Sequence, residues 1–258
     1  MTILTALILF IAAVLGGALN SVAGGGSFIT FPSLFLTGVL PIQANATSTV
    51  ALWPGSLASV GAYRKELAAQ DRVLVLVLVS TSLVGGVLGA ILLLHTPQST
   101  FQQLIPYLLL LATLLFAFSG PITSRLRKRG LAVQKTSTSR LKLVSISFFQ
   151  LIVAIYGGYF GGGIGILMLA SLGLMGMENI HEMNALKTIL QSCINGVAVI
   201  TFIIAGAVVW LQAIVMIVGA IAGGFTGAYY ARQLDPRLVR GFVILVGISL
   251  TIYFFVRR

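Results

Sequence analysis

Long runs of apolar residues alternate with short polar or charged stretches along the whole chain, five runs in each half. A helix rises 1.5 Å per residue, so about 20 residues cross the roughly 30 Å hydrocarbon core of a bilayer. Most of the runs approach this length. We therefore expect helices at Ile3–Val22, Phe28–Leu40, Ala44–Tyr63, Val73–Leu94, Leu104–Ser119, Leu143–Phe160, Ile164–Met175, Ala185–Ala205, Leu211–Ala231 and Phe242–Val256.

The two halves carry the same landmarks in the same order. The first has Gly24–Gly26, Asn45–Thr49, Gly85–Ala90 and Pro97, and the second has Gly161–Gly163, Asn184–Thr188, Gly223–Ala228 and Pro236. The offsets are 137, 139, 138 and 139 residues. A nearly constant offset indicates a duplicated unit. We expect an N-terminal half at 1–120, a basic linker at 121–142 and a C-terminal half at 143–258.

The second run of each half is short and directly follows a triple glycine. Glycine favours an unwound backbone, and within a bilayer such a backbone must face protein or a cavity. We expect the first two runs of each half to form a hairpin that is broken inside the membrane.

Basic residues predict the orientation. The linker 121–142 has seven Lys or Arg and no acidic residue, which is typical of a cytoplasmic segment. Alternating crossings then place Arg64–Arg72 and Arg232–Arg240 in the cytoplasm and both termini outside. The charged loop follows the third run in one half and the fourth run in the other. This difference, with an odd number of crossings per half, predicts two inverted-topology repeats.

Composition supports a polytopic all-α membrane protein. The chain has 258 residues, 58% of them hydrophobic and 8% charged, whereas soluble domains have about 25% charged residues. The net charge of +11 lies mostly between the apolar runs. Because no basic helix with interleaved aromatic residues is present, the sequence does not favour nucleic-acid binding.

The glycine triplets are candidate anion sites, because a short helix that starts after each one points its positive N-terminus into the membrane. Close helix packing is the alternative explanation. In this interpretation the backbone N–H groups of Ser27 and Ile164 hold anionic oxygens. The candidate substrate-binding residues here are Asn20, Gly24, Gly25, Gly26, Ser27, Gly161, Gly162, Gly163 and Ile164.

The third run of each half carries a polar stripe at helical spacing, which indicates either a cavity wall or interhelical hydrogen bonds. The stripes comprise Asn45, Ser48, Thr49 and Ser56, and Asn184, Lys187, Thr188, Gln191 and Asn195. From them we take Asn45, Ser48, Thr49, Asn184, Lys187, Thr188 and Gln191 as further substrate-binding candidates. Lys187 would be the counter-charge to an anion, or would reach the interface by snorkelling.

The sequence offers no catalytic, cofactor or metal site. Cys193 is the only cysteine, the two histidines are far apart, and all five acidic residues lie in loops or at the ends of runs. No nucleotide-binding loop is present. These features favour a protein that is not an enzyme.

Several motifs together resemble the TauE/SafE-type sulfite exporter family. They are residues 20–27 with Phe31-Pro32, the run ANATSTVALWPGSL at 44–57, Tyr63-Arg64-Lys65-Glu66, Met183–Lys187 and Ile194-Asn195-Gly196. The resemblance covers almost the whole chain. It implies a multi-pass permease of the bacterial inner membrane, in a family that moves sulfite, sulfonates and related anions.

The expected function is therefore secondary transport of a small sulfur-containing anion through a lipid bilayer. An anion channel, a membrane-embedded enzyme and a non-transporting assembly subunit are the alternatives. A homo-oligomer is compatible with the sequence.

Overall fold

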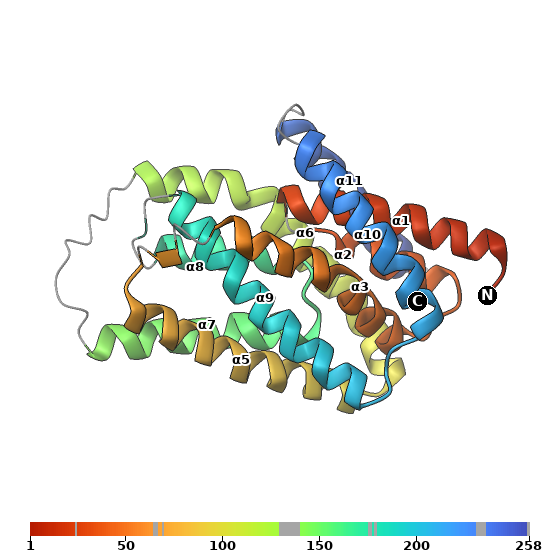
Figure 1. Cartoon of the computed structure of the whole chain (residues 1–258), viewed down its shortest axis with the longest axis horizontal. Helices are drawn as coiled ribbons and strands as arrows, with labels where there is room; N and C mark the ends of the chain where they lie inside the picture. Colours follow the sequence, from red (N-terminus) through yellow and green to blue (C-terminus); the bar gives the residue numbers. More distant parts are fainter. Residues whose placement is uncertain are drawn as a thin grey trace.

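A computed structural model describes residues 1–23, 25–63, 67–68, 70–128, 140–174, 177, 180–230 and 236–256. Throughout these ranges the regular structure is helical, which confirms the all-α prediction (Figure 1). The helices are α1 (Ile3–Ala23), α2 (Ser27–Leu36), α3 (Pro41–Ala62), α5 (Arg72–His95), α6 (Gln98–Lys128), α7 (Arg140–Tyr159), α8 (Ile164–Leu174), α9 (Ile180–Ile204), α10 (Trp210–Tyr230) and α11 (Pro236–Val256).

The helix ends differ most from the sequence prediction where a helix extends beyond its apolar run into polar residues. Helix α6 continues to Lys128 instead of ending at Ser119, and α9 begins at Ile180 rather than Ala185. The apolar pattern marks only the part of a helix that faces apolar surroundings, and polar residues such as Lys and Arg extend a helix well. The short second run of each half is a helix of 10 residues in α2 and 11 in α8.

Local sequence signals explain two helix starts. Pro41 occupies the first turn of α3, where its missing N–H costs nothing because that donor would have no partner in the helix. The Asp71 carboxylate caps α5 by accepting the Val73 N–H at 2.8 Å. Pro41 therefore marks the end of the connection from α2 to α3, and Asp71 marks the end of the connection from α3 to α5.

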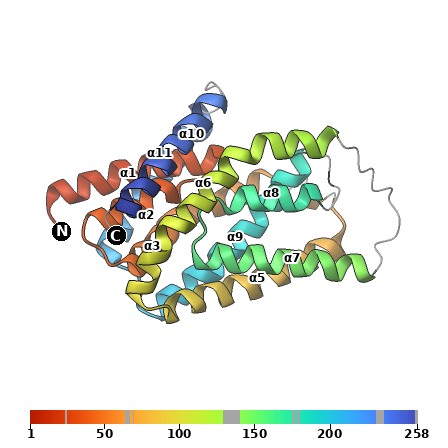
Figure 2. The same cartoon turned by 180° about the vertical axis from the view of Figure 1, so that it is seen from behind.

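Helices from the two halves of the chain pack against one another in matching pairs. Helix α1 packs on α10. In the matching pair, α7 packs on α5, where α7 corresponds to α1 and α5 corresponds to α10 by the sequence offset (Figure 2). Likewise α5 contacts α9 and α10 contacts α3. Two further contacts, α3 with α9 and α6 with α11, join each helix to its own counterpart.

The repeated glycine motifs lie at the closest of these helix contacts. A Cβ added at Gly158 of α7 would meet the backbone of Gly86 in α5. On the other side of the molecule, a Cβ at Gly17 of α1 would meet the backbone of Ala220 in α10. Small residues allow helix backbones to approach in this way where lipid supplies no hydrophobic driving force.

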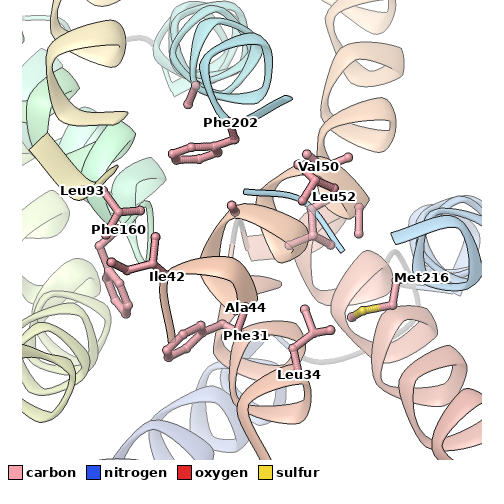
Figure 3. Close-up of a cluster of buried hydrophobic side chains, with 14 of the residues drawn as sticks. Phe31, Leu34, Ile42, Ala44, Val50, Leu52, Leu93, Phe160, Phe202 and Met216 are labelled. Atoms are coloured by element: carbon pink, nitrogen blue, oxygen red, sulfur yellow. The ribbon is translucent and has the colours of Figure 1, made fainter. Parts of the chain in front are cut away.

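Aromatic and aliphatic side chains fill the interior between α2, α3, α6 and the end of α7 (Figure 3). The Phe31 ring lies edge-on to Phe160, with 5.8 Å between ring centroids, and edge-on to Phe101 at 6.5 Å. A second cluster, which includes Leu78, Met168 and Leu190, joins α5, α8 and α9. The two clusters hold the short helices α2 and α8 in place.

The outer surface is strongly apolar. Large side chains such as Ile3, Phe148 and Phe225 point outward and are 91%, 64% and 81% exposed. Within the described residues, three helical segments are long and apolar enough to cross a bilayer, namely Ile3–Asn20, Arg72–His95 and Glu182–Ile204. Soluble proteins rarely expose so much continuous apolar surface, so lipid is the natural environment of this fold.

Candidate functional site

A small polar pocket lies where the two glycine breaks meet the middle of α3 and α9. Neutral side chains and backbone from five segments line it: Asn20, Ser27, Thr49, Leu52, Gly161, Gln191 and Asn195. Its free volume of about 10 Å³ holds roughly one water molecule. Both halves of the chain contribute to this pocket.

The sequence analysis named five of these seven residues. Asn195 belongs to the polar stripe of α9, but it was not included among the candidates. Leu52 carries no polar signal, and only its sequence offset of 139 from Gln191 singles it out. The pocket thus pairs an apolar residue of α3 with a polar one of α9.

The second glycine triplet forms a tight turn between α7 and α8. Gly161 and Gly163 have φ values of +73° and +71°, which side chains other than glycine rarely adopt. The Tyr156 hydroxyl donates to the Gly162 carbonyl at 2.6 Å and holds the turn against α7. The Ile164 N–H donates to the Gly161 carbonyl at 3.3 Å, so it is not the free anion donor that the sequence suggested.

The first glycine triplet packs closely against its neighbours. Gly24 lies outside the described residues, and Gly25 and Gly26 are buried. A Cβ at Gly26 would meet the Gly16 carbonyl and would lie 3.0 Å from the Asn20 Cβ and 3.1 Å from the Leu52 Cδ1. Close approach is therefore the reason for glycine at this position.

The polar side chains of α3 bond mainly to the protein itself. Asn45 donates to the Tyr159 carbonyl at 3.1 Å and caps the end of α7. The Ser48 hydroxyl pairs with Thr30 of α2 at 2.6 Å, and Thr49 donates to the Asn45 carbonyl at 2.9 Å. Asn45 therefore fixes the end of α7 and Ser48 fixes the short helix α2, while Thr49 also reaches the pocket.

Hydrogen bonds connect α3 directly to α9 beside the pocket. The Trp53 indole N–H donates to the Ser192 carbonyl at 3.1 Å, and the Ser192 hydroxyl donates to the Ser56 carbonyl at 3.2 Å. The Trp53 ring lies against Gly196, where an added Cβ would be 3.2 Å away. These contacts join α3 to α9 at residues next in sequence to the pocket residues Leu52 and Gln191.

The polar side chains of α9 are different. Within the described parts of the chain, the side chains of Asn184, Lys187, Gln191 and Asn195 have no hydrogen-bond or ion-pair partner. Gln191 is 8% exposed and lines the pocket, where its amide is open to a polar partner. Thr188 alone is bonded, to the Asn184 carbonyl at 2.7 Å, and it does not line the pocket.

Gln191 connects the pocket to the first turn of α8. A Cβ placed on Gly165 would lie 3.3 Å from the Gln191 Oε1 and 3.5 Å from the Lys187 Cδ. Lys187 is therefore not part of the pocket wall but lies next to it, across the start of α8. The N-terminus of a helix attracts negative charge, and so does a lysine ammonium group.

The model of the family described as sulfite exporter TauE/SafE matches residues 9–254 of the chain. This match extends over nearly the whole described structure, including every residue of the pocket. It confirms the resemblance drawn from the sequence motifs.

Curated relatives agree with this match. A "Probable membrane transporter protein" of Haemophilus influenzae is 27% identical and aligns with 95% of this chain and 92% of its own length. The Escherichia coli K12 protein "Probable membrane transporter protein YfcA" is 26% identical over 93% of this chain and 85% of its own. A Sinorhizobium relative, "Probable membrane transporter protein ORF9", is 28% identical over 95% and 90%. No solved structure gives a significant match.

Proposed function

Because the chain belongs to the sulfite exporter TauE/SafE family of membrane transporters, we propose that it is a secondary permease for a small oxidised-sulfur anion, such as sulfite or an organosulfonate. We place it in the bacterial inner membrane, where polytopic helical proteins reside. The observation that carries the proposal is the Gln191 amide, which lines the pocket and has no hydrogen-bond partner in the described residues. Buried polar groups of this kind are characteristic of ligand sites.

The anionic group would bind between Gln191, Lys187 and the first turn of α8. Two features favour a negative charge there: the ammonium of Lys187 and the positive end of the α8 dipole. The proximity of both side chains to Gly165 supports this arrangement. Asn195 and Ser27 add neutral donors on the pocket side.

We also propose that residues 1–120 and 143–258 are inverted repeats joined by a cytoplasmic linker at 121–142. The matching helix pairs support this, since a two-fold relation requires that α1 with α10 be repeated as α7 with α5. The bond between Trp53 and Ser192, which are 139 residues apart, supports it too. A residue that contacts its own counterpart lies close to the symmetry axis.

The size of the pocket favours a carrier over an open channel. A space that holds about one water molecule is too small for a sulfonate group, which has four heavy atoms. Substrate entry would therefore require α3 and α9 to move apart, which breaks the hydrogen bonds of Trp53 and Ser192. Alternating access in inverted repeats uses rocking of this kind around a central site.

Flux through proteoliposomes tests the function. We expect saturable uptake of radiolabelled sulfite or an organosulfonate, and accelerated uptake when unlabelled substrate is preloaded on the opposite side. Preloading accelerates a carrier, whereas a channel shows no counterflow. Uptake of carboxylate controls without uptake of sulfur anions would contradict the proposed substrate class.

Substitution of Lys187 tests the anion site. We expect Lys187→Met to weaken anion binding by about tenfold to a hundredfold, because one charged contact worth roughly 1.5–3 kcal/mol is lost. Lys187→Arg keeps the charge and should retain part of the affinity. Isothermal titration of the purified variants measures the effect. Unchanged affinity in a well-folded Lys187→Met protein would mean that Lys187 only snorkels.

A further inference from the structure

Helix α3 contains two adjacent residues that weaken a helix, Pro54 and Gly55. Because Pro54 has no N–H, α3 lacks the hydrogen bond that the Val50 carbonyl would accept in an unbroken helix. Sharp bends in helices occur at proline and at Gly/Ser pairs, and Gly55 with Ser56 is such a pair. Pro54 lies two residues after Leu52, which lines the pocket. The weakest point of α3 is therefore next to the candidate site.

Neither backbone conformation nor close packing explains the glycine at position 55. Gly55 does not have a positive φ, and α3 continues as a helix through it to Ala62. A Cβ added at Gly55 would meet nothing within 4 Å. Alanine would fit there and would favour the helix. The property that glycine adds at this position is the ease with which its backbone leaves the helical conformation.

The part of α3 before Pro54 is bonded to several neighbouring helices. Its side chains make hydrogen bonds of 2.6–3.1 Å to α2, to the end of α7 and to the residue that precedes α10. The pairs are Ser48 with the Thr30 hydroxyl, Asn45 with the Tyr159 carbonyl and Thr47 with the Val209 N–H. These bonds fix the first part of α3 in the molecule.

Beyond Pro54, Ser56 joins α3 to α1 and α9. Its hydroxyl accepts from the Asn20 amide at 3.1 Å, and its carbonyl accepts from the Ser192 hydroxyl at 3.2 Å. The next residue, Leu57, is 50% exposed. A bend at residues 54–55 has to break the two bonds of Ser56 and leaves those of the first part intact. Asn20 also lines the pocket, so the bend is linked to the site.

Helix α9 has no such weak point. The sequence offset of 139 places Cys193 and Ile194 at the positions that correspond to Pro54 and Gly55. Helix α9 runs through both without a proline, and Ile194 is completely buried. A Cβ added at Gly86 of α5 would lie 3.0 Å from the Ile194 carbonyl oxygen, so α9 is packed closely at this level. The two corresponding helices therefore differ in their capacity to bend.

We propose that α3 bends at Pro54 and Gly55 during transport, so that residues 55–62 move away from α9. This inference rests on the proposed function and identifies its moving part. Pro54 and Gly55 are positioning residues, because neither lines the pocket. The bend creates the space beside the pocket that a substrate larger than one water molecule requires.

The variant Gly55→Ala tests the hinge through the rate of transport. Alanine favours the helix over glycine by a factor of about five, so the bent conformation should become about fivefold less populated. We expect the saturated uptake of radiolabelled sulfite into proteoliposomes to slow by about fivefold, while the melting temperature stays equal or rises. The dissociation constant for sulfite, measured by isothermal titration, should change by less than about twofold, because the pocket is unaltered.

Gly241→Ala is the matched control, because its added Cβ also meets nothing within 4 Å and Gly241 has no proline neighbour. It should keep the wild-type uptake rate. Pro54→Ala supplies the missing N–H and should slow uptake by about tenfold or more, since proline weakens a helix more than glycine does. Wild-type uptake rates in folded Gly55→Ala and Pro54→Ala proteins would overturn the inference.

Hydrogen exchange tests the hinge without a substrate. In the full-length protein in nanodiscs, we expect the amides of residues 55–62 to exchange at least about tenfold faster than those of residues 194–201, their counterparts in α9. Gly55→Ala should slow the exchange of 55–62 by about fivefold. Equal exchange in the two segments, unaffected by Gly55→Ala, would overturn the inference and leave the proposed function intact. The expected exchange in a protein that transports neither sulfite nor a sulfonate would support the hinge and contradict the proposed function.

Discussion

Two glutamines show that one residue type can either bond within the fold or remain without a partner in this protein. Gln150 is 1% exposed and donates to the Ser82 hydroxyl at 2.8 Å across the contact of α5 and α7. Gln191 is 8% exposed, and the described part of the chain offers its amide no partner. The first has a hydrogen-bond partner within the fold, whereas the second lines the pocket without one.

Replacing each glutamine by leucine should separate stability from function. We expect Gln191→Leu to melt at the same or a higher temperature, because its amide makes no hydrogen bond within the described fold, yet to lose substrate binding. Gln150→Leu should destabilise the protein by about 1–3 kcal/mol, because Ser82 is left without its donor. Thermal unfolding in detergent and isothermal titration measure the two effects.

Two outcomes would contradict the role of Gln191 as a ligand contact. If Gln191→Leu unfolds at a much lower temperature than the wild type, then its amide supports the fold rather than a ligand. If it keeps full substrate affinity, Gln191 does not contact the anion.

At the scale of the elements, pairs of helices from different halves join the molecule. The contact of α5 with α7 brings the Gly86 and Gly158 backbones together, and that of α1 with α10 does the same at Gly17 and Ala220. Because lipid supplies no hydrophobic driving force between helices, close van der Waals packing has to hold the two halves together. Even one added methyl group has no space at these positions.

We expect Gly158→Ala to destabilise the protein by about 1–3 kcal/mol, because its Cβ would meet the Gly86 backbone, which cannot rotate away. Gly241→Ala in α11 is the matched control, since nothing lies within 4 Å of its added Cβ. Alanine favours helices, so this control should be neutral or slightly stabilising. Thermal unfolding measures the stability of both variants. Equal melting temperatures would mean that α5 and α7 can move apart to accommodate the added methyl group.

At the scale of the whole molecule, the inverted arrangement requires both termini to lie on the side opposite the linker 121–142. The N-terminus and the end of α11 point toward the same end of the long axis (Figure 1). This placement is compatible with an odd number of crossings in each half, and it makes the topology open to direct measurement.

Cysteine labelling measures that topology in a Cys193→Ala background. We expect Thr2→Cys and Ser99→Cys to react with an impermeant maleimide in intact spheroplasts, and Ser137→Cys to react only in inside-out vesicles. The reason is the positive-inside rule, applied to a linker without acidic residues. Labelling of Thr2→Cys from the cytoplasmic side alone would replace the five-plus-five arrangement by an even-numbered one.

The sequence by itself determined the helical class, the approximate helix positions and the family. Apolar runs of bilayer length are sufficient for the first two, because in lipid every backbone hydrogen bond has to be made within the helix. Helix ends were less accurate, as at α6, because hydrophobicity reports the surroundings of a helix and not its length. The glycine and polar motifs also supplied five of the seven residues that line the pocket.

Only the tertiary structure decided which polar groups are free. Asn45 and Gln191 both belong to polar stripes, and no local pattern distinguishes them. Asn45 meets the end of α7 and is satisfied, whereas Gln191 faces the pocket and is not. Hydrogen-bond partners of this kind lie more than a hundred residues apart in the chain, as Asn45 and Tyr159 do. Their pairing depends on how the helices pack, and therefore the free donors and acceptors of the site are a property of the assembled fold.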